Sequence, residues 1–255
     1  MRAKAIVALI LAASLSFCAS KQVRIQKARE KDPKYHYNVG LFHLNQGNVE
    51  ESVKSFVKSL SLDTRFYQSW NALGLAHSMR GRLDEAVKAY LKCLEINPQF
   101  SEAHNNLGTV YDRMGRLDQA EAEWQAALQD PLNQSRELAY TNLARLYIVQ
   151  DRLDEAFDCV QRAIQIQPRL AMAHNLRGQV YEKRNNLVEA VASYEAAVKI
   201  VPDDVLFNYN LGVAYFKTTE YGKAREAFLK IQSRVTDTDI RDSISRYLRL
   251  IGAQR

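Results

Sequence analysis

Cysteine is scarce in this sequence, and the motifs of common catalytic sites are missing. Only three cysteines occur, Cys18, Cys93 and Cys159, which excludes a disulfide framework and a cysteine-rich metal site. The chain has no Gly-rich phosphate loop and no G-x-S-x-G nucleophile motif. We therefore predict a protein that is not an enzyme and has no metal, no other cofactor and no small-molecule substrate.

Neither sign of charge dominates, and the apolar run at the N-terminus is short. The 35 Lys and Arg residues stand against 29 Asp and Glu residues, and both kinds are spread along the chain. Such a balance does not favour a nucleic-acid partner. The run AIVALILAASLSF at residues 5–17 is shorter than the roughly 20 residues that a membrane-spanning helix needs.

The N-terminal segment has the three-part pattern of an export signal. Arg2 and Lys4 precede the apolar run, and small residues follow it. We expect residues 1–17 to be an export signal, rather than a buried helix of a cytoplasmic protein, and residues 18–32 to be a charged tether. Cys18 is then either a lipid attachment point or the neighbour of an ordinary cleavage site. Phe17 departs from the small residue that precedes a lipidated cysteine.

The rest of the chain is dominated by a repeated segment. NALGLAHSMRGRLDEAVKAYLKCLEINP at residues 71–98 returns in similar form at residues 105–131, 141–168, 175–202 and 209–231, with a weaker copy at 37–63. Small residues keep a spacing of 34, or 36 between the third and fourth copies. The first series is Gly40, Gly74, Gly108, Ala144, Gly178 and Gly212, and the second is Ser52, Ala86, Ala120, Ala156, Ala190 and Ala224. Six matched copies indicate a repeat protein.

Each copy is predicted to form a helical hairpin. Apolar residues recur at three- and four-residue spacings in two blocks of about 14 residues that a short polar turn separates, which is typical of two amphipathic helices. Small residues are needed where the helices approach each other closely. Pro98, Pro168 and Pro202 end second helices. Stacked hairpins then bury a continuous core.

These residues resemble the tetratricopeptide repeat, whose pattern has a large residue at position 4, Leu-Gly at 7 and 8, Tyr at 11, Ala at 20, an aromatic residue at 24, Ala at 27 and Pro at 32. The resemblance implies an all-α fold, a right-handed α-solenoid of six hairpins plus a C-terminal capping helix. The predicted repeats in residues 33–238 are 33–66, 67–100, 101–134, 137–170, 171–204 and 205–238, with Ser135 and Arg136 as extra residues, and the capping helix is 239–255. No residues remain for a catalytic domain.

The histidines and the two later cysteines fall at packing positions of the repeat. His36, His104 and His174 occupy position 4, and His43 and His77 occupy position 11. We expect all five to be structural, and Cys93 and Cys159 to be inert core thiols.

Family geometry implies that positions 2, 5, 9 and 12 of the first helices line a groove that binds a partner. The groove residues that we predict to bind are Tyr37, Leu41, Leu44, Asn71, Leu75, Asn105, Thr109 and Asn175. The apolar ones form a patch at the first repeat, unless the preceding segment covers them. The asparagines offer donors and an acceptor to a peptide backbone, unless Asn is simply common at this position. Tyr209, Val213 and Phe216 are expected to receive the capping helix.

An export signal followed by six repeats resembles the PilF/PilW/Tgl-type pilotins of type IV pili, and the irregular joint LQDPLNQSRELAYTNLARLY supports this resemblance. It implies a lipoprotein, anchored through Cys18 at the periplasmic face of the outer membrane, that binds the pilus secretin and promotes its localisation and multimerisation. A soluble periplasmic protein is the alternative for location. A scaffold in envelope assembly or division, unrelated to pili, is the alternative for function.

Overall fold

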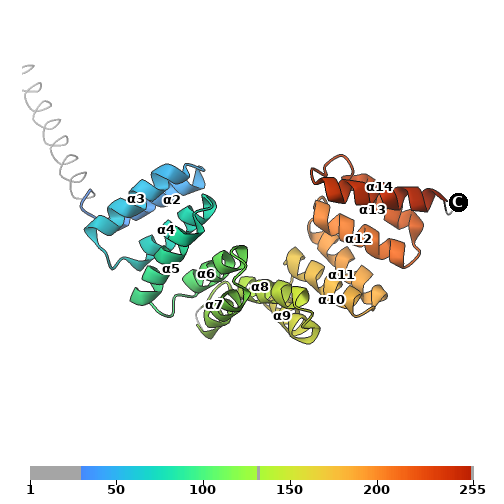
Figure 1. Ribbon diagram of the computed structural model, residues 1–255, viewed down its shortest axis with the longest axis horizontal. Coiled ribbons are helices and arrows are strands. Elements are labelled where there is room, and N and C mark those ends of the chain that lie inside the picture. The colour runs from blue at the N-terminus through green and yellow to red at the C-terminus, as the bar shows by residue number, and fades with distance from the viewer. Residues whose placement is uncertain (1–29, 131–132, 254–255) are drawn as a thin grey trace, which may run out of the picture. The chain divides into compact units, whose positions relative to one another are not determined.

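The computed structural model describes residues 30–130 and 133–253, and within these ranges it contains thirteen α-helices and no strand (Figure 1). The predicted all-α fold is confirmed. The predicted export signal and Cys18 lie outside the described residues. The chain divides into two compact units, Met1–Arg116 and Leu117–Arg255.

The first unit contains two complete hairpins and one further helix among its described residues. The hairpins are α2 (Pro33–Asn45) with α3 (Val49–Leu62), and α4 (Tyr67–Met79) with α5 (Leu83–Ile96); α6 (Ser101–Arg113) follows. Asp32 caps α2, because its side chain accepts a hydrogen bond from the backbone N–H of Lys34 at 2.9 Å. The last residue of the predicted tether is thus part of a helix cap.

The second unit contains one helix, three hairpins and a last helix in the part that the structure describes. These are α7 (Leu117–Gln129), α8 (Arg136–Val149) with α9 (Leu153–Ile166), α10 (Ala171–Lys183) with α11 (Leu187–Ile200), α12 (Val205–Lys217) with α13 (Tyr221–Ile231), and α14 (Thr238–Ala253). Arg136, predicted to lie between repeats, is the first residue of α8. Thr238 begins α14 one residue early, because the Asp237 carboxylate accepts hydrogen bonds from the backbone N–H groups of Asp239 and Ile240.

A glycine lies against an aromatic ring in four of the hairpins. The pairs are Gly40 with Phe56, Gly74 with Tyr90, Gly178 with Tyr194 and Gly212 with Phe228. A Cβ atom on Gly178 would lie 2.5 Å from the Tyr194 ring, so only glycine lets the ring lie on the backbone of the first helix. The fourth repeat has Ala144 at this place and a smaller residue, Val160, at position 24.

The second series of small residues is fully buried, which agrees with the prediction of close helix contact. Ser52, Ala86, Ala120, Ala156, Ala190 and Ala224 are each 0% exposed. A larger side chain at any of these positions would separate the helices of its hairpin.

Successive hairpins are joined by a side-chain hydrogen bond from position 4. The Nε2 atoms of His36, His104 and His174 lie 2.9 Å from the carbonyl oxygens of Glu30, Pro98 and Pro168, each six residues earlier. Trp70 and Asn208 donate to the carbonyls of Thr64 and Pro202 in the same way. His104 and His174 each bond a carbonyl at a joint between hairpins, and His36 bonds a carbonyl just before α2, so these histidines have the structural role that we expected.

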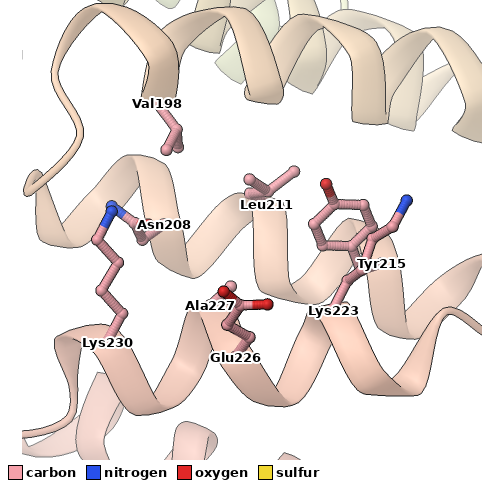
Figure 2. A pocket seen from close by; sticks show the side chains of 8 residues that line it. All are labelled: Val198, Asn208, Leu211, Tyr215, Lys223, Glu226, Ala227 and Lys230. Atoms are coloured by element: carbon pink, nitrogen blue, oxygen red, sulfur yellow. The ribbon is translucent and has the colours of Figure 1, made fainter.

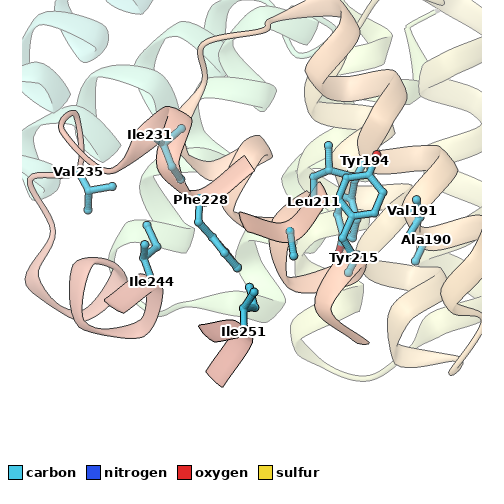
Figure 3. Close-up of a cluster of buried hydrophobic side chains, with 12 residues drawn as sticks. Ala190, Val191, Tyr194, Leu211, Tyr215, Phe228, Ile231, Val235, Ile244 and Ile251 are labelled. Carbon is cyan, nitrogen blue, oxygen red and sulfur yellow. The ribbon is translucent and has the colours of Figure 1, made fainter. Parts of the chain in front are cut away.

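The last helix, α14, covers the end of the final hairpin (Figure 3). Ile244 and Ile251 are 1% and 4% exposed, in one cluster with Phe228 and Ile231 of α13. The Tyr247 ring stacks on Phe228 with centroids 5.2 Å apart. The prediction of a capping helix is confirmed.

Candidate functional site

The apolar residues predicted for the groove of the first unit lie on two adjacent helices. Tyr37, Leu41 and Leu44 belong to α2 and Leu75 belongs to α4, and these helices contact each other. All four side chains are half-buried. The α2 residues pack against the core of the first two hairpins, so the hairpin core fixes each side chain and leaves part of it at the surface.

Met79 extends this apolar surface toward the end of α4. Its side chain is 55% exposed, and it follows Leu75 by one helical turn. We define Leu41, Leu44, Leu75 and Met79 as the apolar strip. An apolar partner segment gains about 25 cal/mol for each Å² of apolar surface that it removes from water here.

Asn71 does not offer its amide to a ligand. The side chain is 5% exposed, its Nδ2 donates to Oε1 of Glu102 at 2.9 Å, and its Oδ1 accepts from Nδ2 of Asn106 at 3.2 Å. These bonds tie α4 to α6. The structure thus corrects the prediction of a peptide-facing amide, because the donor and the acceptor are both used between repeats.

Asn175 in the second unit is also corrected, because its side chain is buried and cannot face a peptide. It is 0% exposed, and its Oδ1 accepts from Nδ2 of Asn210 at 2.8 Å. Both inter-repeat pairs join an asparagine at position 5 to one at position 6 of the next repeat, 35 residues later. This spacing is visible in the sequence and is the signal by which the pairs could have been found.

Asn105 and Thr109 lie on α6, where the surface of the first unit becomes polar. Asn105 is half-buried and Thr109 is exposed, and the Thr109 hydroxyl donates to the Asn105 carbonyl at 3.0 Å. The predicted groove residues of the first unit are therefore mainly apolar on α2 and α4 and polar on α6.

The corresponding surface of the second unit is closed at its end by α14. The Phe216 ring lies 4.9 Å from that of Tyr247, and the hydroxyl oxygens of Tyr209 and Ser243 are 2.8 Å apart. The expectation that Tyr209 and Phe216 receive the capping helix is confirmed, and Val213 packs against the same core cluster. Glu182 beside them accepts hydrogen bonds from Lys217 and Tyr194.

A cavity of about 340 Å³ lies on the second unit between α11, α12 and α13 (Figure 2). Its lining includes apolar Val198 and Leu211, with Lys223 and Lys230 among its charged residues. Both lysines are engaged within the protein, Lys223 with Glu220 and Lys230 with the Pro202 carbonyl. Asn208 likewise donates to the Pro202 carbonyl and Tyr215 to Glu195, so most of the polar groups of the lining are engaged within the protein.

The two later cysteines are buried thiols with raised pKa values. Burial raises the pKa of Cys93 to about 12 and that of Cys159 to about 11, and neither thiol is bridged. Such thiols are not nucleophiles at neutral pH. No group of three or more potential metal ligands occurs among the described residues, and none of their helices is long and apolar enough to cross a bilayer.

Comparison with known families gives a consistent result along the chain. Models described as tetratricopeptide repeat match residues 33–65, 67–100, 89–122, 138–167 and 207–234, and one described as TPR repeat matches 178–218. Together these matches span more than half of the chain.

Two solved structures share the fold over most of their length. PilW, described as a widely conserved type IV pilus biogenesis factor, has a TM-score of 0.75 and 16% identity, covering 83% of this chain and 97% of PilW. PilF of Pseudomonas aeruginosa has a TM-score of 0.78 and 16% identity, covering 86% of this chain and 99% of PilF. These identities show likeness of fold alone.

Among curated proteins, a peroxisomal targeting signal receptor of Candida glabrata is 30% identical over 87 residues. The match covers 34% of this chain and 15% of the receptor. The chain thus matches only a small part of this relative, as expected for a shared repeat.

Proposed function

Because this chain belongs to the tetratricopeptide repeat family and shares its fold with PilW and PilF, we propose that it is a pilotin-type adaptor. In this role it binds a segment of the type IV pilus secretin and promotes the localisation and multimerisation of the secretin at the outer membrane. The adaptor performs no chemistry and acts by binding and by position.

The apolar strip on α2 and α4 carries this proposal. The Leu41 and Leu44 side chains pack against the hairpin core and are partly exposed, so they are ordered before a partner arrives. Preorganised apolar contacts cost little conformational entropy on binding. The strip favours a partner segment with apolar side chains on one face.

We further propose that Cys18 carries a lipid that anchors the protein at the periplasmic face of the outer membrane. The basic start, the apolar run of residues 5–17 and the cysteine at its end support this location. Several acyl chains on one residue hold a protein stably, whereas a single chain gives marginal binding. Incorporation of a labelled fatty acid should be lost in Cys18→Ser, and label that persists in this variant excludes the anchor.

The binding surface is tested with Leu41→Asp combined with Leu75→Asp. We expect heat-resistant secretin multimers and twitching motility to be lost, because two charges interrupt the strip on both helices. The matched control is Val57→Asp with Leu91→Asp, which places two charges on second helices of the same hairpins, where the side chains are 51% and 42% exposed.

Folding of the double variant is checked by circular dichroism, and Met79→Asp tests the same strip at a more exposed position. Normal multimers in the folded Leu41→Asp, Leu75→Asp variant would show that this surface does not bind the secretin. Normal multimers after deletion of the whole gene would reject the pilotin role itself and favour a scaffold unrelated to pili.

A further inference from the structure

The outer face of α2 has the residues of a buried helix face, but no helix covers it within the described residues. Each later first helix contacts the second helix of the preceding hairpin. At position 10 of the later first helices, the buried residues are Ala76, Val110, Leu146, Val180 and Ala214, each 0–1% exposed. Phe42 holds the same position on α2 and is 61% exposed.

Two further residues complete this face, which we call the α2 face. Tyr35 and Val39 hold positions 3 and 7, which are buried at the corresponding Ala103 and Leu107. Repeat arrays need a polar cap at each end, and α14 supplies one at the other end of the chain. The α2 face is therefore a packing surface that requires an occupant.

The path of the chain into α2 identifies the segment next to this face. The His36 Nε2 atom lies 2.9 Å from the Glu30 carbonyl, as His104 does from Pro98 and His174 from Pro168. In the later joints this carbonyl lies two residues beyond the end of a second helix, since α5 ends at Ile96 and α9 at Ile166. The chain therefore leads from Glu30 into α2 in the same way as it leads from a second helix into the next first helix at the later joints.

The residues before Glu30 fit the register of such a helix. Ile25 falls at position 27, which is buried in all six repeats: Ser59, Cys93, Ala127, Ala163, Ala197 and Ile231. Lys27 falls at position 29, where all six residues are exposed: Ser61, Glu95, Gln129, Gln165, Lys199 and Ser233. Arg24 falls at position 26, where the four basic residues Lys58, Lys92, Arg162 and Lys230 are exposed.

We propose that residues 18–29 bind the α2 face as the second helix of an incomplete preceding repeat, with Ile25 directed toward Val39 and Phe42. A helix of this length is marginal alone in water, so its order depends on the contact with α2. Its direct connection to α2 gives it a high effective concentration at the face. The inference is independent of the secretin and of a lipid on Cys18.

Trypsin tests the proposal on the full-length chain in mild detergent. Arg24 and Lys27 are cleavage sites, and a docked segment is cleaved only when it opens. We expect Phe42→Asp to speed cleavage at these two sites by about tenfold or more, because cleavage follows the population of the open form. Val57→Asp is the matched control, since Val57 is 51% exposed on α3, and it should leave the rate unchanged.

A second substitution distinguishes binding of residues 18–29 to the α2 face from a general destabilisation by Phe42→Asp. Ile25→Asp should speed cleavage as much as Phe42→Asp, and the double variant should be no faster than either single variant, because both remove one contact. Equal cleavage rates in the wild type and Phe42→Asp overturn the proposal.

Hydrogen exchange and sedimentation provide two further tests. Should Phe42→Asp unfold, hydrogen exchange of the wild type decides: protected amides in residues 21–29 support the proposal, and exchange at the rate of an unstructured peptide overturns it. Sedimentation tests a second copy as occupant. A dimer that Phe42→Asp dissociates, with Arg24 and Lys27 cleaved rapidly in the wild type, assigns the face to dimerisation and overturns the proposal.

Discussion

Gly178→Ala should destabilise the second unit although alanine favours helices. The new Cβ atom would lie 2.5 Å from Cε1 and 2.6 Å from Cδ1 of Tyr194. The ring has little room to move, because Tyr194 is 0% exposed and its hydroxyl donates to Glu182 at 2.6 Å. Overpacking costs about 1–3 kcal/mol and the gain in helix propensity offsets up to about 1, so we expect a net loss of roughly 1–2 kcal/mol.

Gly222→Ala is the matched control, since it makes the same chemical change in α13. A Cβ built there meets no atom of another helix within 4 Å, so this variant should be neutral or more stable by up to about 1 kcal/mol. Native-state hydrogen exchange of α10 and α11 reports the second unit directly. If the amides of α10 and α11 exchange as slowly in Gly178→Ala as in Gly222→Ala, the steric explanation of the glycine–ring pair is wrong.

Two more predictions concern titratable groups whose pKa is shifted by partial or full burial. Burial lowers the pKa of His77, so the folded state favours the neutral ring and the free energy of unfolding should fall as the pH drops below about 6.5. Urea titrations between pH 7.5 and 5 should show a smaller fall in His77→Tyr, and an unchanged pH dependence would contradict this. Cys93 and Cys159, with pKa values raised by burial, should react with iodoacetamide at pH 8 at least about a hundredfold more slowly in the native protein than in urea. Similar rates, measured by peptide mass spectrometry, would show that the thiols are accessible.

The fold could be predicted from the sequence because the 34-residue period carries most of the information. Small residues, apolar spacing and prolines each mark a position in the hairpin, and all of them agree on the same register. The one-residue shift at Thr238 follows from a local contact, the Asp237 cap, which the period does not contain. The fourth repeat departs from the pattern at two positions, with Ala144 at position 8 and Val160 at position 24.

The binding surface was harder to predict, because position in the repeat gives the direction of a side chain and not its partners. Asn71 and Asn175 hold predicted surface positions, but both side chains are buried, and Asn106 and Asn210 of the following repeats donate to their Oδ1 atoms. Leu41, Leu44 and Leu75 are partly exposed, as predicted, because their neighbours on α2 and α4 cover only part of each side chain. Whether these residues bind a partner remains a prediction.

The covered face of α13 has a consequence for assembly. In an array of like repeats, the outer face of the last second helix fits the first helix of another copy, and such head-to-tail contacts grow into open filaments. Ile244 and Ile251 occupy that face beside Phe228 and Ile231. The 16 residues of α14 thus cover the face that the first helix of another copy would need, and a chain shortened before Thr238 would expose Phe228 and Ile231.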